Sequence, residues 1–245
     1  MRNIIPVIMV TIFITLLQSC NTMIKEDQGV PQDNNFYNLC LILDGTDRLA
    51  EQNGVPEVTI EEIMEITECV SEKGKGTLYV SYVDNNCDNN HVAIYEWLED
   101  KPLSHGEKSG YMKMSEYKKL EKADVDKQEA YNHRLTDALE EFSRKCLIVR
   151  DLAYSDAVAL QKNGSDVNGA INQAIKLLRA SAQEGIHSYI ILVSDGCDNV
   201  GKEQEELSPG TELIIVNSNV LKHQYQKIVS REFVTLRQAI NYIFS

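Results

Sequence analysis

Three short, continuous apolar runs limit what this chain can fold into more than any other feature of its sequence. They cover residues 39–43, 189–193 and 213–216. Runs of this length without alternating polar residues are typical of strands that are buried on both faces of a sheet. Amphipathic helical patterns lie between the runs, and one of them begins at a capping box formed by Thr59 and Glu62. The sequence therefore predicts an α/β fold with a doubly wound, mostly parallel central sheet and helices on both of its faces.

The remaining segments extend this pattern on both sides. Residues 77–83 and 91–97 are strand-like and are separated by the turn-rich sequence DNNCDNN, so we expect an antiparallel hairpin at one edge of the sheet. Further on, a lysine-rich stretch predicts a short helix, and the capping pair Asp126 and Glu129 predicts the start of another. After the third apolar run we expect a helix through Tyr225 and Ile228, a short strand at residues 232–234 and a last helix capped by Thr235.

The N-terminal residues resemble a bacterial lipoprotein signal. Arg2 is the only charge before an apolar stretch over residues 4–17, and Gln18-Ser19-Cys20 follows it. We expect residues 1–19 to be removed, Cys20 to carry a lipid such as palmitate, and residues 20–37 to form a flexible tether for a domain over residues 38–245. The alternative is an uncleaved N-terminal anchor. Both place the domain outside the cytoplasm on a membrane surface. The lipid anchor predicts the cell envelope, at the outer membrane, with the domain facing either the periplasm or the outside.

Charge and cysteine content exclude two classes of function. The net charge is −13, from 24 Lys+Arg against 37 Asp+Glu, which is unsuited to binding the phosphate backbone of a nucleic acid. The cysteines have no zinc-site spacing, and Cys40, Cys69 and Cys146 lie among apolar neighbours, where we expect them to pack as small hydrophobic side chains.

Oxygen-bearing side chains follow two of the apolar runs and precede a predicted helix. Asp44 and Thr46 come directly after the first run, Asp195 follows the second, and Ser165 lies just before the helix that begins near Val167. In open α/β sheets, ligands bind outside the carboxyl ends of the strands. Carboxylates and hydroxyls are the ligands that Mg²⁺ and Mn²⁺ prefer. The sequence therefore predicts a divalent-metal site among three loops, at residues 44–47, 164–166 and 194–198, although Ser165 or its neighbour Asp166 could also be only the cap of the helix.

In this arrangement the chain resembles a von Willebrand factor type A domain from about residue 37 to its end. That family's metal-ion-dependent adhesion site uses an Asp-x-Ser-x-Ser loop, a separate Thr or Ser, and a later Asp. Asp44 and Thr46 match the first two loop positions, Ser165 matches the separate hydroxyl, and Asp195 matches the last position. The resemblance implies a protein partner whose own carboxylate completes the metal's coordination. It also implies that the chain has a helical insertion at about residues 99–162, because a minimal member of the family has a shorter segment at this place.

Arg48 departs from the family's pattern, because it occupies the third loop position, where the family has a Ser ligand. A guanidinium is always charged and has no lone pair for a cation. Either Arg48 points away and leaves a weakened site, in which water and Asp47 or Asp166 fill in, or its guanidinium replaces the metal by bridging Asp44 and Asp195.

Three functions from different classes are consistent with these residues. The first is a membrane-tethered, non-enzymatic protein-binding module that uses the von Willebrand factor type A-like site. The second is a Mg²⁺-dependent phosphohydrolase of the haloacid dehalogenase kind, with Asp44 as nucleophile; it lacks the second Asp two residues later, where Thr46 stands. The third is a purely structural envelope lipoprotein.

Overall fold

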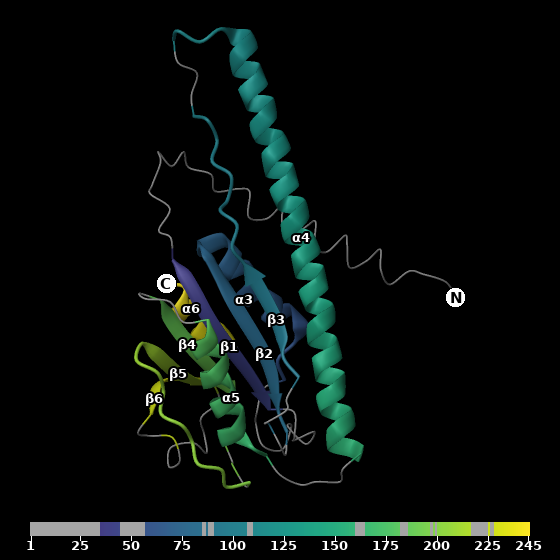
Figure 1. Cartoon of the computed structure of the whole chain (residues 1–245), viewed down its shortest axis with the longest axis vertical. Helices are drawn as coiled ribbons and strands as arrows, with labels where there is room; N and C mark the ends of the chain where they lie inside the picture. The colour runs from purple at the N-terminus through teal and green to yellow at the C-terminus, as the bar shows by residue number, and fades with distance from the viewer. Residues whose placement is uncertain are drawn as a thin grey trace, which may run out of the picture. The chain divides into compact units, whose positions relative to one another are not determined.

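A six-stranded sheet forms the centre of the computed structural model (Figure 1). Its strands lie in the order β3-β2-β1-β4-β5-β6, which is the order of a doubly wound sheet. All neighbouring strands are parallel except β2 and β3, which form the antiparallel edge pair that the sequence predicts. The bounds are Phe36–Asp44 for β1, Lys75–Val83 for β2, Ala93–Trp97 for β3, His187–Val193 for β4, Thr211–Val216 for β5 and Val229–Phe233 for β6. The predicted fold class is confirmed.

The structure describes residues 35–44, 57–84, 87, 91–106, 110–159, 165–181, 186–196, 198, 200–216, 225 and 228–245. They all belong to the unit Asn34–Ser245, whereas the unit Met1–Asp33 lies outside the described residues. The predicted signal sequence and the lipidation site Cys20 therefore fall outside them as well. Among the helices that the structure describes, none is both long enough and apolar enough to cross a bilayer.

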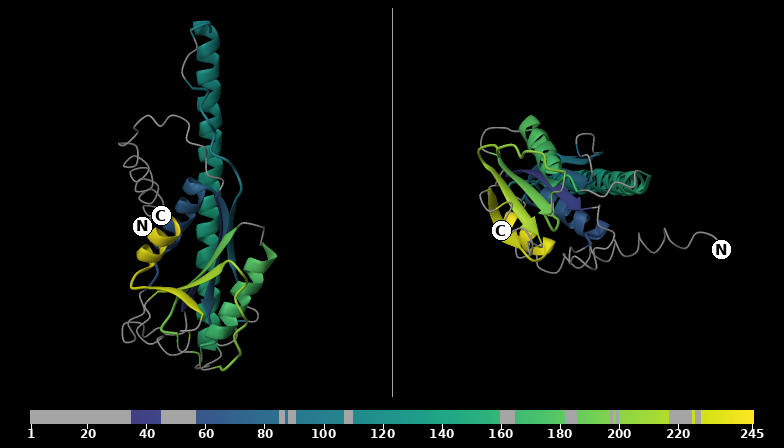
Figure 2. Two further views of the ribbon diagram at one scale, coloured as in Figure 1. Left: turned by 90° about the vertical axis from the view of Figure 1, so that its left-hand side faces the viewer. Right: turned by 90° about the horizontal axis from the view of Figure 1, so that it is seen from below.

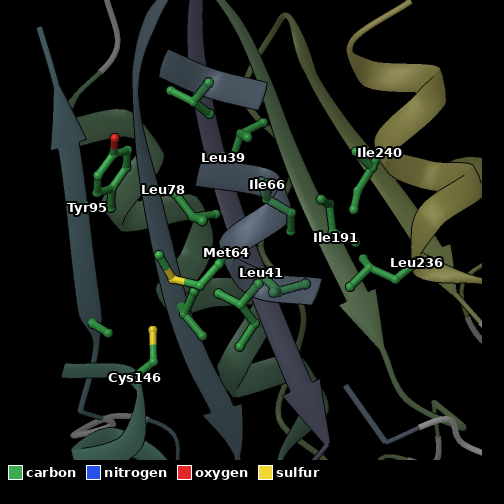
Figure 3. Packing of buried hydrophobic residues seen from close by; sticks show 14 of the residues in the cluster. Leu39, Leu41, Met64, Ile66, Leu78, Tyr95, Cys146, Ile191, Leu236 and Ile240 are labelled. Carbon is green, nitrogen blue, oxygen red and sulfur yellow. The ribbon is translucent and has the colours of Figure 1, made fainter. Parts of the chain in front are cut away.

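Helices cover both faces of the sheet, because alternate residues of the central strands point to opposite sides (Figure 2). On one face, Leu39 and Leu41 of β1 pack in a cluster with α3 (Ile60–Lys73), α4 (Met114–Ala159) and α6 (Leu236–Ile243), part of which Figure 3 shows. On the other face, Cys40 and Ile42 pack against α5 (Val167–Ala180) and the buried Tyr225. The predicted capping box at Thr59 is present, and the predicted cap Thr235 forms a capping box with Gln238, so these two helices begin where the sequence indicates.

One predicted helix boundary is wrong. The capping pair at Asp126 and Glu129 does not begin a helix, because α4 runs without interruption from Met114 to Ala159, 46 residues or about 70 Å. No Gly or Pro occurs within these residues to break the helix. The predicted insertion therefore holds a single long helix, whose C-terminal half packs on the sheet through residues such as Phe142 and Cys146.

The buried cysteines provide a test of this packing. The four described cysteines, Cys40, Cys69, Cys87 and Cys146, are free thiols. Burial raises the pKa of both Cys40 and Cys146 to about 12, so each stays protonated at pH 8 in the folded protein. Because the thiolate is the nucleophile, we expect iodoacetamide at pH 8 to alkylate both residues only after unfolding, as peptide mapping with and without urea would show. Equal labelling of Cys146 in the folded and unfolded protein would contradict the docking of α4.

Candidate functional site

Three adjacent strands end in acidic residues at the carboxyl end of the sheet, the end at which the parallel strands terminate. Asp44 is the last residue of β1 and is in register with Val83 of β2, so Asp84 lies one residue beyond it. Leu43 of β1 is in register with Val193 of β4, which places Asp195 two residues past the end of β4. In doubly wound sheets the ligand crevice lies at such a point, where the strand order reverses between the first strand and the fourth.

A serine hydroxyl joins the ends of β1 and β4. Ser194, which is fully buried, donates a hydrogen bond from Oγ to Oδ2 of Asp44 over 2.7 Å. The Oγ of Ser194 also accepts a hydrogen bond from the N–H of Gly196 over 2.9 Å. Asp44 and the Ser194–Gly196 loop are thus held against each other, and the partly exposed Asp195 lies between the two loop residues that make these bonds.

The start of α5 lies at the same end of the sheet. The N–H of Asp166 donates to the backbone oxygen of Asp84 over 2.7 Å, and Ser165 precedes Asp166 directly. The Asp166 carboxylate is fully buried and caps α5 by accepting the N–H of Gly169 over 3.0 Å. Its Oδ2 also accepts the N–H of Cys87 over 3.0 Å, so one side chain fixes the start of α5 to the turn after β2.

The charge of this buried carboxylate is balanced by Lys202. The Nζ of Lys202 lies 2.6 Å from Oδ2 of Asp166, with the lysine side chain 30% exposed and the carboxylate inaccessible. An unpaired buried carboxylate would be costly, and an ammonium at this distance offsets that cost. In this structure Asp166 therefore serves as a helix cap and as the ion-pair partner of Lys202.

Asp198 accepts three backbone hydrogen bonds close to the start of α5. Its Oδ2 accepts the N–H of Asn168 in the first turn of α5 over 2.8 Å, and its Oδ1 accepts the N–H groups of Val200 and Gly201 over 3.0 and 2.9 Å. The segment that follows β4 is thereby held to the start of α5.

Polar side chains on α5 extend this attachment along the helix. Asn168 donates to the backbone oxygen of Lys202 over 2.7 Å, Asn172 donates to that of Glu203 over 2.9 Å, and the Arg179 guanidinium binds Glu205 over 3.2 Å. The loop that carries Asp195 is therefore positioned from both β1 and α5.

Three of the predicted site residues, Asp44, Ser165 and Asp195, lie at one end of the sheet. Three residues that were not predicted lie at the same end: Asp84, Ser194 and Lys202. Thr46 and Arg48 lie outside the described residues. The oxygen donors fit Mg²⁺ or Mn²⁺ by chemical type. Within the described ranges, however, no group of three or more His, Cys, Asp or Glu side chains is arranged to hold a metal ion. A metal at Asp44 and Asp195 would therefore depend on hydroxyl ligands or on residues outside these ranges.

Sequence reasoning did not select Asp84, Ser194 or Lys202. Asp84 follows a strand-like run, as Asp44 does, and this pattern could have identified it. It was not selected because residues 77–97 were predicted to be a hairpin at the edge of the sheet. Ser194 stood beside a selected residue. No local sequence pattern identifies Lys202, because its partner Asp166 lies 36 positions earlier in the chain.

Comparison with known proteins does not assign the chain to a family. The chain matches no protein-family model, and no curated protein is significantly similar to it. The resemblance to von Willebrand factor type A domains therefore stays a prediction from the residues quoted above.

Proposed function

We propose that the chain is an extracytoplasmic protein-binding module, tethered to the membrane by a lipid on Cys20, that contacts its partner with the carboxyl end of the sheet. The observation that carries the proposal is that Asp44, Asp84 and Asp195 follow three adjacent parallel strands. Such a set of acidic groups suits recognition of a basic protein surface, or of a carboxylate through a bridging Mg²⁺ or Mn²⁺.

The loop geometry supports binding by a preformed surface. Ser194 fixes the loop after β4 to Asp44, while Asp198 and Lys202 fix its continuation to the start of α5. Because these bonds hold the segment after β4 to β1 and to α5, this segment has little conformational entropy left to lose when a partner binds. In this proposal Asp44, Thr46, Ser165 and Asp195 determine affinity, and Arg48 either weakens the metal position or takes the place of the ion.

Photo-crosslinking in the native envelope tests the proposal. The crosslinking amino acid p-benzoylphenylalanine is placed at Val200, close to Asp198 at the carboxyl end, and separately at the exposed His187, which begins β4 at the opposite end. We expect a discrete protein adduct from position 200 and none from position 187. Adding Asp195→Asn should lower the yield from position 200 about tenfold, because we expect the partly exposed carboxylate to contribute about 1.4 kcal/mol to binding. Equal yields from both positions, or a yield that Asp195→Asn leaves unchanged, would contradict the proposal.

Lys202 is the observation that favours the phosphohydrolase as a second candidate, because that chemistry requires a lysine for the phosphate and Lys202 lies at the same end of the sheet as Asp44. In that case Asp44 would be the nucleophile. The protein would then hydrolyse p-nitrophenyl phosphate with Mg²⁺ and lose this activity in Asp44→Asn. We expect no turnover, because Oδ2 of Asp44 accepts the Ser194 hydroxyl and Lys202 is paired with Asp166.

A further inference from the structure

The N-terminal part of α4 buries none of its side chains fully. The first buried side chain of this helix is Tyr131, and none of the residues from Met114 to Ala130 is buried. These 17 residues span about 25 Å of helix. Figures 1 and 2 show that this part of α4 extends past the sheet, whereas the other half packs on it.

The extension is braced by the segment that leads into it. Glu99 and Arg134 form a double hydrogen bond, with a closest distance of 2.8 Å. The N–H of His105 donates to Asp124 over 2.7 Å, and its ring contacts Tyr117 with centroids 5.1 Å apart. The extension is therefore supported along one side, and no other described residue packs on its opposite side or its end.

Exposed apolar side chains gather at this end. We name the described residues 110–122 the α4 tip. Tyr111 is fully exposed, and Met114 is 56% exposed. The spacing of Met114, Lys118 and Lys122 is four residues, so the three side chains share one face of the helix. One apolar and two basic groups thus lie on the same face of the helix.

Among the described residues, the lysines of the α4 tip form no ion pair. Lys113, Lys118, Lys119 and Lys122 are exposed, and the described part of the chain contains no acidic partner for any of them. By contrast, each of the following lysines is paired with an Asp or Glu: Lys75, Lys145, Lys176 and Lys202.

The local charge is opposite in sign to that of the chain. Four Lys against Glu116 and Glu121 give the α4 tip a charge of 4 − 2 = +2, whereas the whole chain carries −13. An anionic partner would therefore be attracted to the tip and repelled by the rest of the molecule.

We propose that the α4 tip docks on a bilayer surface that contains anionic lipid. Lysines together with exposed Tyr and Met side chains on a projecting end are the composition of an interfacial membrane contact, in which apolar groups enter the headgroup region and ammonium groups meet lipid phosphates. A folded acidic protein would require a complementary surface, whereas a bilayer accepts a convex tip. This second membrane contact goes beyond the proposed function and does not depend on the acidic end of the sheet.

Tryptophan fluorescence of the full chain tests this inference at one residue. The Tyr111→Trp variant is mixed with vesicles of phosphatidylcholine alone or of phosphatidylcholine with phosphatidylglycerol. The natural Trp97 is buried and supplies a constant background. We expect the emission to shift to shorter wavelength only with phosphatidylglycerol. Lys118→Gln with Lys119→Gln should weaken the docking equilibrium about 25-fold, roughly fivefold for each lysine. Lys145→Gln with Lys176→Gln removes two lysines from the packed domain and should leave the shift unchanged.

Four results would overturn the inference. They are no shift with either vesicle, an equal shift with both, a shift that survives the Lys118→Gln and Lys119→Gln pair, and a shift that grows with protein concentration without vesicles. The last would show that the tip binds a second copy of the chain. A shift caused by soluble polyglutamate and not by vesicles would instead assign the tip to an acidic protein. The Val234→Trp variant, with a tryptophan at a 73% exposed site on the domain, is the control for nonspecific adsorption.

Discussion

Replacing Asp166 with Ala is expected to lower the free energy of unfolding by about 3 to 4 kcal/mol. The variant loses the cap of α5 and leaves the N–H of Cys87 buried without its acceptor. It also leaves Lys202 without its carboxylate, but we count this loss as small because the lysine side chain is 30% exposed. Urea denaturation followed by circular dichroism measures the change.

Two substitutions separate these contributions. Asp166→Asn keeps an oxygen that can accept the N–H of Gly169 and loses the charge, so we expect roughly half of the destabilisation. Asp137→Ala removes a carboxylate that is 63% exposed on α4 and should change the free energy of unfolding by less than about 0.5 kcal/mol. If Asp166→Ala were as mild as Asp137→Ala, the assignment of Asp166 as a buried cap and ion-pair partner would be wrong.

The second large effect is expected for Phe142→Ala, which should destabilise the protein by about 4 kcal/mol. Phe142 is 1% exposed and packs on Tyr95 of β3, with ring centroids 5.4 Å apart. Its removal leaves a cavity where α4 meets the sheet, and the same denaturation experiment measures the loss. Ile148→Ala, on the same helix but at a side chain 58% exposed, should cost less than about 1 kcal/mol. Similar losses for the two variants would show that α4 does not dock through this face.

The sheet could be predicted from the sequence because its strands are coded locally. The apolar runs at residues 39–43, 189–193 and 213–216 became β1, β4 and β5, since only strands covered on both faces tolerate such runs. Thr59 and Thr235 marked helix starts correctly, because a capping box is formed by residues three positions apart.

The same local signal failed at Asp126, because a capping box starts a helix only where the preceding chain is not helical. Residues on both sides of Asp126 are good helix formers, and the absence of Gly and Pro from residues 114–159 was the signal that would have predicted one continuous helix. A mean propensity over the whole segment would have outweighed the single capping pair.

The site could be predicted only in part, for a related reason. Asp44 and Asp195 follow apolar strands, and parallel strands end on one side of a sheet, so their common location was predictable. The bonds that position them are not local: Ser194 reaches Asp44 across 150 residues, and Cys87 reaches Asp166 across 79. No pattern in one sequence specifies such pairs.

The central claim is that Asp44 and Asp195 act as parts of one site, and a calorimetric titration with Mn²⁺ tests it most directly. The three proteins compared are the unmodified chain, Arg48→Ser, and Arg48→Ser with Asp195→Asn. Serine supplies an oxygen ligand where the guanidinium offers none, so Arg48→Ser should bind Mn²⁺ at least about tenfold more tightly than the unmodified chain. Adding Asp195→Asn should remove that gain. An unchanged titration for Arg48→Ser, or a gain that persists with Asp195→Asn, would contradict the claim that these residues share a site.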